Sequence, residues 1–295
     1  MNLELLNEYL NKVYSKDTCY PICRDDWNDN NPTLGHCAIV SLIVNDYLGG
    51  EIYKIKVDGV SHYFNFIDNK VIDLTSSQFN KEIDYSNKTI KERKEILQDE
   101  DTLSRYNMLK MRLQLVIEDK EIHECNLCTN MIEKFPNSKT VSIGKRNDIV
   151  ILGEAPANNG WRKSGVAWYD TNHKLLPSGV VLKKLLDEIN IKLEDTYFLE
   201  AIKCYPKDRK YLNKCSENCK KYLFKQLEII KPKVVLALGN AATRSILNVN
   251  YKKFSEVVGK EFDINGYKVI PLYHPSPVSP MSSKGNIEII KRIEL

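Results

Sequence analysis

The stretch IVILGEAPANNGWRKSG, residues 149–165, decides the fold of the second half of the chain. Its first four residues are apolar and predict a short buried strand. A turn rich in glycine and proline then ends the strand and carries Glu154, Asn158 and Asn159 out of its carboxyl end. The stretch therefore predicts a strand with polar groups at its exit.

Three later stretches repeat this build, an apolar run that ends in polar residues: YFLEAIKC (197–204), VVLALGN (234–240) and VIPLYHPSP (269–277). Strands that alternate with helices usually lie parallel, and their carboxyl ends meet at the edge where open α/β folds bind ligands. We therefore expect four polar side chains to face one pocket: Glu154, Glu200, Asn240 and His274.

The 295 residues are enough for two domains, and a chain that is 28% charged and 42% hydrophobic is typical of a soluble protein. Residues 1–120 hold 15 Lys and Arg against 20 Asp and Glu, whereas residues 121–295 hold 28 against 19. Only the second half has the positive balance that suits a polyanion such as DNA. A solvated, lysine-rich surface would give the same counts.

The amino-terminal stretch MNLELLNEYLNKVYSKD mixes acids and lysines among its leucines, so it predicts an amphipathic helix and no signal peptide. No apolar run approaches the length that spans a membrane. We expect a cytoplasmic protein without membrane contact, and no pattern identifies a protein partner.

Residues 1–119 predict a smaller α+β domain. An apolar helix over 38–48 ends at two glycines, and alternating segments over 51–57 and 61–67 are joined by Asp58 and Gly59, a strong hairpin signal. A strand over 70–79 follows. The long helical pattern over 105–124 closes this domain and leads into the second.

Cys37, His62 and Asp73 form a possible second site in this first domain. Cys37 precedes the apolar helix, whose dipole favours a thiolate. The order Cys, His, Asp matches a papain-like nucleophile, base and orienting acid. The competing interpretation is a buried cysteine that packs and a histidine that is only a satisfied polar group.

Eight cysteines without a secretory signal favour metal or catalytic use over disulfides. Cys125, Cys128, Cys204 and Cys219 offer four thiolates from two distant segments, which predicts a closed site for zinc or an iron–sulfur cluster. Cys215 competes for the fourth position. We prefer Cys219 because it begins the predicted helix CKKYLFKQLEII, whose amino-terminal end favours a thiolate.

Several motifs now carry a resemblance. CNLC, GEAPANNGWRKSG, PSGVVLKKLLDEINI, YFLEAIKCYPKDR and HPSP, in this order over residues 121–280, resemble the iron–sulfur branch of the uracil-DNA glycosylase superfamily. The resemblance implies a three-layer α/β/α fold with a central parallel sheet over residues 120–295. It also implies excision of a base from DNA, and a [4Fe–4S] cluster in preference to zinc on four cysteines: Cys125, Cys128, Cys204 and Cys219.

The segments GHCAIVSLIVNDYLGG, SHYFN and VIDLTSSQF resemble a bacterial family of small uncharacterised proteins, the YunG-like proteins. That similarity covers nearly all of residues 1–119. It implies a domain boundary and no activity.

The chemistry of base excision assigns roles within the glycosylase-like motifs. Breaking a glycosidic bond leaves a cationic sugar and an anionic base, so the site needs an acid near the sugar and a donor at the base oxygen. Glu154 suits the first role and His274 the second, and we expect Asn159 to join this catalytic group. An acid after a strand can also be only a turn cap, and a histidine before proline can be structural.

Base binding has its own candidates. A flipped base needs an aromatic face and hydrogen bonds to its edge. Trp168 stands where the family keeps its stacking phenylalanine, and the polar residues around it favour a lid over a core position. Ala155 and Ala157 would line the pocket and let the DNA backbone approach, and Glu200 would face the base edge.

Glu200 departs from the family pattern, because members that take uracil have an asparagine there. An ionised carboxylate only accepts hydrogen bonds, so it prefers an edge with donors such as the exocyclic amine of cytosine. Our hypothesis is a glycosylase for a modified cytosine, such as glucosylated hydroxymethylcytosine of phage DNA, acting in antiviral defence. Protonation of Glu200 would restore a donor, so uracil excision in DNA repair is the alternative.

Two other classes of function stay open. The second domain would be a non-catalytic reader of modified DNA if it binds without cutting, or the main activity would be a Cys-His-Asp hydrolase in the first domain.

Basic residues near the cysteines suggest phosphate contacts; they are Lys203, Lys207, Arg209, Lys210 and Lys214.

Overall fold

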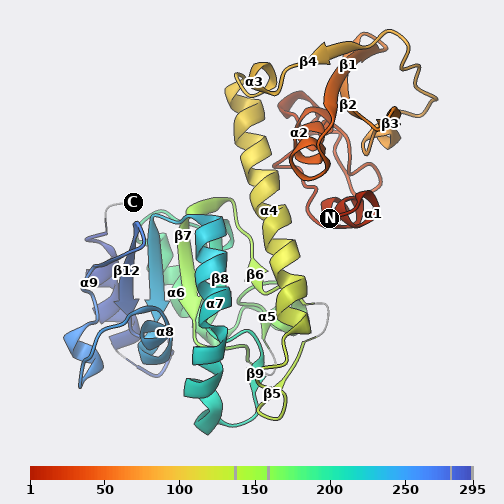
Figure 1. Ribbon diagram of the computed structural model, residues 1–295. Helices are drawn as coiled ribbons and strands as arrows, with labels where there is room; N and C mark the ends of the chain where they lie inside the picture. Colours follow the sequence, from red (N-terminus) through yellow and green to blue (C-terminus); the bar gives the residue numbers. More distant parts are fainter. Residues whose placement is uncertain (136–137, 158–159, 280, 294–295) are drawn as a thin grey trace. The chain divides into compact units, whose positions relative to one another are not determined.

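The computed structural model describes residues 1–135, 138–157, 160–279 and 281–293. The chain folds into two compact units, Met1–Ile117 and Glu118–Leu295 (Figure 1). The family resemblances had suggested a boundary at residues 119 and 120. Within the described ranges, no helix is both long enough and apolar enough to cross a membrane.

The first unit is a small α+β domain. Its elements are α1 (Leu3–Asn11), η1 (Pro21–Cys23), α2 (Cys37–Leu48), β1 (Glu51–Val57), β2 (Val60–Ile67), β3 (Lys70–Ile72), η2 (Ser76–Gln78), β4 (Thr89–Lys91), α3 (Arg93–Ile96) and the start of α4 (Glu100–Glu124). The antiparallel sheet has the order β3-β2-β1-β4. Buried residues of α1, α2 and α4 share one hydrophobic cluster with Ile52 of β1.

Two local predictions for this unit are confirmed. Asp58 and Gly59 both have positive φ, 50° and 80°, and join β1 to β2 as a tight hairpin. Gly49, with φ of 76°, ends α2 immediately after Leu48. The predicted strand over 70–79 is shorter than expected, because β3 ends at Ile72 and Asp73 follows it.

The second unit has the predicted three-layer α/β/α fold. Its elements are the end of α4, β5 (Ile132–Glu133), β6 (Val141–Ser142), β7 (Arg146–Gly153), α5 (Trp161–Ser164), α6 (Pro177–Asp187), β8 (Thr196–Glu200), β9 (Tyr205–Pro206), α7 (Leu212–Ile230), β10 (Val234–Leu238), α8 (Gly239–Ile246), β11 (Phe262–Ile264), β12 (Tyr267–Leu272) and α9 (Asn286–Ile290). The central sheet has the order β11-β12-β10-β7-β8-β6.

The four inner strands of this sheet, β12, β10, β7 and β8, run parallel, and only the two edge strands are antiparallel. All five residues of β8 and all five of β10 are buried, as expected for strands covered on both faces. Figure 1 shows α7 across one face of the sheet and α6 on the other.

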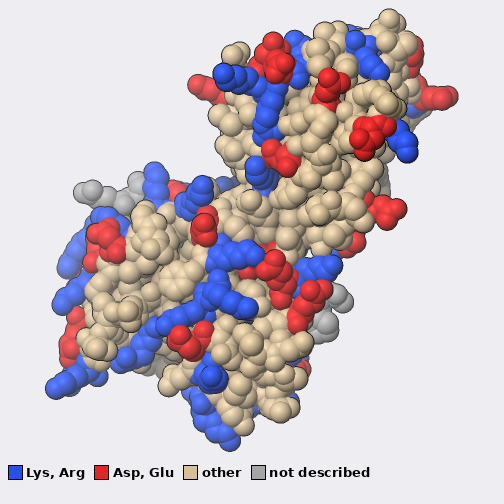
Figure 2. All heavy atoms as spheres, viewed as in Figure 1, with Lys and Arg blue, Asp and Glu red and all other residues tan. Residues whose placement is uncertain are grey.

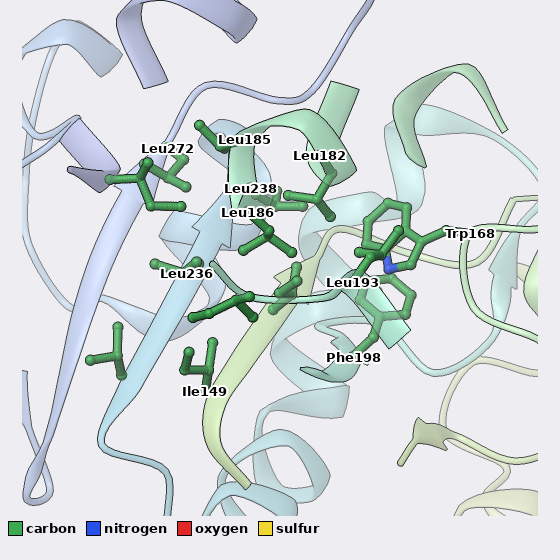
Figure 3. Close-up of a cluster of buried hydrophobic side chains, with 14 of the residues drawn as sticks. Ile149, Trp168, Leu182, Leu185, Leu186, Leu193, Phe198, Leu236, Leu238 and Leu272 are labelled. Carbon is green, nitrogen blue, oxygen red and sulfur yellow. The ribbon is translucent and has the colours of Figure 1, made fainter. Parts of the chain in front are cut away.

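The core under α6 holds the sheet in place. Leu182, Leu185 and Leu186 of α6 recur at helical spacing, and they pack with Ile149 and Leu236 of the sheet (Figure 3). Because alternate residues of a strand point to opposite faces, this cluster uses one face of the sheet. The rigid sheet fixes where the carboxyl ends of its strands lie, and the candidate site depends on those ends.

Candidate functional site

One cavity of about 530 Å³ lies at the carboxyl edge of the parallel sheet. It is lined by seven of the residues singled out from the sequence: Glu154, Ala155, Ala157, Trp168, Glu200, Asn240 and His274. They come from the ends of β7, β8, β10 and β12, from the loop that follows β7 and, for Trp168, from the segment between α5 and α6. Asn159, the remaining catalytic candidate, and its neighbour Asn158 lie outside the described residues.

The pairing of β7 with β8 brings the two acids to the same edge. Gly153 lies opposite Glu200 in this parallel pair. Beyond the strands, the backbone N–H groups of Ala201 and Ile202 donate to the carbonyls of Gly153 and Glu154 at 2.9 and 3.0 Å. The main chain therefore stays paired past the sheet and holds both carboxylate-bearing residues at the cavity.

Glu154 lies beside a cation at the mouth of the cavity. Its carboxylate is 3.3 Å from the Nη1 of Arg209, and the Glu154 side chain is 27% exposed. The Arg209 side chain is 81% exposed, so water screens this pair strongly. Glu154 therefore keeps an accessible carboxylate, and the stability of the fold does not depend on the pair.

His274 reaches the same cavity from the loop after β12. Gly239, with φ of +84°, begins α8 beside it, and a β-carbon on Gly239 would lie 3.3 Å from Cβ of His274. Only glycine combines this backbone conformation with such a close approach. Burial lowers the pKa of His274, and the Glu154 carboxylate opposes that shift. The imidazole is therefore neutral at neutral pH and offers an N–H donor.

The sequence had suggested that the Glu200 carboxylate is free to face the base edge, but in the structure it is paired with an arginine. Nε of Arg162 donates to Oε2 of Glu200 at 2.9 Å, and both side chains are almost completely buried. Burial raises the pKa of Glu200, and the Arg162 guanidinium acts against that rise. Because Glu200 also lines the cavity, the pair links the pocket wall to the protein interior.

Trp168 lies at the edge of the hydrophobic core and lines the cavity. It is 9% exposed, and its ring centroid is 4.5 Å from that of Phe198 at a tilt of 49° (Figure 3). Its surroundings are therefore apolar, unlike those of the polar lid that we expected. Phe198 also lines the cavity, so the two rings together form its apolar wall.

Asn240 and the two alanines complete the rim. The hydroxyl of Tyr251 donates to Oδ1 of Asn240 at 2.8 Å and holds its amide in one orientation. Ala155 and Ala157 have no side chain beyond Cβ, so the loop after β7 leaves room at the cavity mouth. This space suits the close approach of a bulky ligand backbone.

A larger hollow of about 920 Å³ lies at the opposite edge of the same sheet, near the amino end of β10. Its walls include Lys231, Lys233 and Lys268, and none of the polar residues from the strand exits. Open α/β folds bind ligands at the carboxyl ends of their strands. We therefore place the functional site in the smaller cavity.

Basic side chains are spread over the face of the second unit that Figure 2 displays. Five basic residues were suggested for phosphate contacts, and for Lys203 this prediction is wrong because the side chain is buried. It is 3% exposed, and its Nζ donates to the Glu200 carbonyl and to Oε1 of Gln226 at 2.6 and 2.5 Å. Burial lowers the pKa of Lys203 to about 8. Lys203 therefore supports the interior, while Arg209 faces the solvent at the cavity mouth.

The cysteines of the second unit gather in a second region. Cys215 and Cys219 are buried in a small cluster against which Cys128 and Cys204 pack. Burial raises the pKa of Cys219, a hydrogen bond from the Lys203 backbone lowers it, and Cys128 and Cys125 raise it. Nδ2 of Asn218 also donates to Sγ of Cys128 at 3.1 Å. Backbone and amide N–H groups that point at sulfur suit thiolates bound to a metal.

These thiols share one cluster but do not form a finished cage. Across the described ranges, no three His, Cys, Asp or Glu side chains are arranged to hold a metal ion. Our reason for preferring Cys219 is wrong, because α7 begins at Leu212 and Cys215, not Cys219, lies in its first turn. Both cysteines face the cluster, so the geometry keeps both as ligand candidates.

The first unit brings together the three residues of the possible second site. His62 Nε2 is 2.5 Å from Oδ2 of Asp73, and Cys37 lies close enough to His62 to raise the pKa of its imidazole. Cys37 begins α2, His62 lies in β2, and Asp73 follows β3.

Sequence reasoning missed Arg162 and Phe198 in the cavity region and the partner of Glu154. Arg162 stands in the motif GWRKSG, directly after the turn that ends β7. A buried carboxylate requires a cationic partner, so a buried Glu200 would have called for an arginine or lysine. The sequence does not identify Arg162 as that partner, because 38 residues separate it from Glu200.

Comparison with known proteins agrees with this division of the chain. A sequence model of the YunG protein family matches residues 2–118, and a model of the uracil DNA glycosylase superfamily matches residues 142–293. The Bacillus subtilis uncharacterized protein YunG is 39% identical over 59 residues, which cover 20% of this chain and 51% of that protein.

The second unit has longer matches. A type-4 uracil-DNA glycosylase of Archaeoglobus fulgidus is 30% identical over 168 residues, which cover 54% of this chain and 80% of that protein. The type-4 uracil-DNA glycosylase of Thermotoga maritima is 30% identical over 165 residues, with 54% and 80% covered. The chain therefore belongs to the uracil-DNA glycosylase superfamily, and a YunG domain precedes its glycosylase-family domain.

Proposed function

We propose that the second unit is a DNA glycosylase that turns a pyrimidine nucleotide out of DNA and hydrolyses its N-glycosidic bond. One observation carries the proposal: Glu154, Trp168 and His274 line a single cavity at the carboxyl edge of the sheet. That set supplies a carboxylate, an aromatic wall and a neutral imidazole. Excision of a flipped base needs all three.

The reaction follows from these positions. As the bond between C1′ and the base nitrogen breaks, its electron pair moves into the base and a cationic sugar remains. The N–H of His274 hydrogen-bonds the anionic base oxygen, and the carboxylate of Glu154 stabilises the cation. Water then attacks C1′, and Glu154 accepts its proton. The products are a free base and an abasic site.

Uracil is the first candidate base. The relatives reported above are named uracil-DNA glycosylases. Burial raises the pKa of Glu200 and the Arg162 guanidinium opposes that rise; a protonated Glu200 would donate to a uracil carbonyl. This choice reverses the order that the sequence alone suggested, and it places the protein in DNA repair.

A cytosine derivative is the second candidate, and the ion pair of Glu200 with Arg162 favours it. In the ionised pair the Glu200 carboxylate only accepts, which suits the exocyclic amine of cytosine. A hypermodified cytosine of phage DNA would fit this preference, and the enzyme would then act in antiviral defence.

Oligonucleotides test both candidates. Matched strands carry uracil, cytosine, hydroxymethylcytosine or its glucosylated form, single-stranded and in duplexes, and alkali cleavage scores abasic sites. Uracil release by the wild type, abolished in Glu154→Gln, supports the first candidate. Release of only a cytosine derivative, with Glu200→Asn shifting activity toward uracil, supports the second. Tight binding with no abasic product from any strand would refute the proposal and indicate a reader of DNA.

We also propose that Cys125, Cys128, Cys204 and Cys219 hold a [4Fe–4S] cluster. When bound, the cluster would tie the segment after α4 to the segment between β8 and α7 and so stiffen the cavity mouth. The donor set supports this assignment, because buried and partly buried thiols from both segments pack in one cluster beside N–H donors. Zinc is the alternative occupant of four thiolates.

A further inference from the structure

The first unit contains a polar constellation that base excision does not use. Cys37 is the first residue of α2, His62 lies in β2 and Asp73 follows β3. The chain thus brings together a thiol, an imidazole and a carboxylate from three separate elements. Such a set is the signature of an activated nucleophile with a base that a third group orients.

His62 and Asp73 form the fixed half of the constellation. Nε2 of His62 is 2.5 Å from Oδ2 of Asp73, and the two side chains are 0% and 4% exposed. The hydroxyl of Tyr85 also donates to Oδ2, at 2.9 Å. The backbone N–H and the hydroxyl of Thr75 donate to Oδ1 at 2.9 and 3.1 Å. Both carboxylate oxygens are therefore occupied, and Asp73 holds the imidazole in one orientation.

Cys37 lies near the same imidazole. Sγ of Cys37 is 3.9 Å from the carbonyl oxygen of Ser61, the residue before His62, and Cys37 is close enough to the ring to raise the pKa of His62. Nε2 faces Asp73, and Nδ1 is 3.3 Å from Nε2 of the Gln78 amide. The thiol, the imidazole and the carboxylate are therefore neighbours in the folded unit.

Exposure and charge fit a reactive thiol better than a packing cysteine. Cys37 is partly exposed, whereas His62 and Asp73 are buried, so the cysteine is the member of the set nearest the solvent and the base is sheltered. Burial opposes the charge of His62, yet Asp73 and Cys37 raise its pKa to about 9. A charged imidazole favours the neighbouring thiolate, as does the amino-terminal end of α2.

We propose that the first unit carries a second active site, in which Cys37 is the nucleophile and His62 moves the proton. Asp73 acts as a positioning residue. The substrate is a carboxylic acyl compound such as an amide or a thioester. The excess of acids in residues 1–120, 20 against 15 basic residues, disfavours a polyanion as its substrate.

The proposed reaction has two steps. The Cys37 thiolate attacks the carbonyl carbon, and the electron pair of the C=O bond moves to oxygen. The N–H groups of the first turn of α2 have no intrahelical acceptor and lie beside the sulfur, so they are available to this oxyanion. The leaving group departs with the proton from Nδ1 of His62. Water, deprotonated by His62, then attacks the thioester and releases the acid and the thiolate.

The first experiment measures alkylation of the full chain by iodoacetamide from about pH 5 to pH 10, with each cysteine quantified by peptide mass spectrometry. The expected rate at Cys37 at about pH 6 is roughly 100-fold higher in the wild type than in His62→Gln, because a thiol without a neighbouring base is largely protonated at that pH. Equal rates at Cys37 in the wild type and in His62→Gln across the pH range would overturn the proposal.

The second experiment uses p-nitrophenyl acetate as an acyl donor and looks for an acetyl group on Cys37. The wild type should give a burst of nitrophenol, Cys37→Ala none, and Asp73→Asn a slower burst with a shifted pH profile. Cys23→Ala is the matched control, because Cys23 is a partly exposed thiol of the same unit and lies near Cys37. An equal burst in Cys37→Ala would exclude the site. Base excision should be unchanged in Cys37→Ala, which separates this proposal from that of the second unit.

Discussion

Arg162 and Glu200 form an ion pair inside the second unit, with Nε of Arg162 2.9 Å from Oε2 of Glu200 and side-chain exposures of 1% and 3%. The arginine comes from α5, directly after the loop that carries Glu154, and the glutamate ends β8. The pair therefore connects the loop of the catalytic acid to the wall of the base pocket. A buried pair of this kind is costly to break, because removal of one partner leaves a charge without compensation.

Arg162→Met should lower the free energy of unfolding by about 3–5 kcal/mol, because it leaves Glu200 buried and unpaired. The double variant Arg162→Met with Glu200→Gln should recover most of that loss. Urea unfolding followed by tryptophan fluorescence measures both, since Trp161 and Trp168 lie in this unit. Arg209→Met is the control, because Arg209 is 81% exposed and its pair should contribute less than about 1 kcal/mol. Equal losses in the two single variants would contradict the prediction.

Glu154→Gln should slow base excision about 100- to 10,000-fold, because the amide neither stabilises a cationic sugar nor accepts a proton from water. DNA affinity should change little, since the substitution keeps the side-chain shape. Single-turnover excision and fluorescence anisotropy measure the two effects separately. Glu261→Gln is a suitable control, because Glu261 is an exposed acid paired with Lys268, away from the cavity. A parallel loss of binding and excision would point to a structural role for Glu154.

His36 should make the first unit less stable in acid. Its ring is fully buried and hydrogen-bonded to Thr18 Oγ1 and to the Leu34 carbonyl, at 2.9 and 2.8 Å. Burial lowers the pKa of His36 to about 4. The unfolded ring takes up a proton below about pH 6.5, and the folded ring does so only near pH 4. The free energy of unfolding should therefore fall by about 3 kcal/mol between these pH values.

Urea titrations of wild type and His36→Gln at several pH values would isolate this contribution. The wild type should lose more stability than the variant on acidification, since carboxylates titrate in both proteins. Identical slopes for the two proteins would show that His36 does not titrate differently on unfolding.

Loss of a cluster ligand should distinguish Cys219 from Cys215. Protein purified without oxygen should absorb visible light and bleach with dithionite if it holds an iron–sulfur cluster. Cys219→Ser should lose most of its iron and sulfide, and Cys215→Ser should keep them. The reverse result would assign Cys215 as the fourth ligand. Zinc with no iron in the wild type would refute the iron–sulfur assignment.

The sequence was enough to predict the parallel strands and their shared edge, and the family resemblance implied the three layers. An apolar run followed by polar residues indicates a buried strand and the carboxyl end at which it leaves the sheet. The turn at Asp58 and Gly59 was equally predictable, because two consecutive residues with positive φ angles favour those residue types. Local chemistry determines these features, and local sequence reveals them.

The partners of charged groups were not predictable. Lys203 looked like a phosphate contact, but its chain turns inward to Gln226, which is 23 residues away. The pairing of Arg162 with Glu200 also depends on how the loop after β7 folds back over the sheet. The start of α7 was missed because seven residues with no clear apolar pattern precede Cys219. The position of Lys203, the Arg162–Glu200 pair and the start of α7 all depend on contacts between residues far apart in the chain, and the spacing of residues along the sequence does not reveal such contacts.

Gly239 sets how closely two loops at the cavity approach each other. A β-carbon at this position would lie 3.3 Å from Cβ of His274 and 3.9 Å from its Cα and backbone nitrogen. A larger residue would therefore push the loop after β12 outward and carry the imidazole with it. One hydrogen atom in place of a methyl group thus determines where the proposed donor to the base stands.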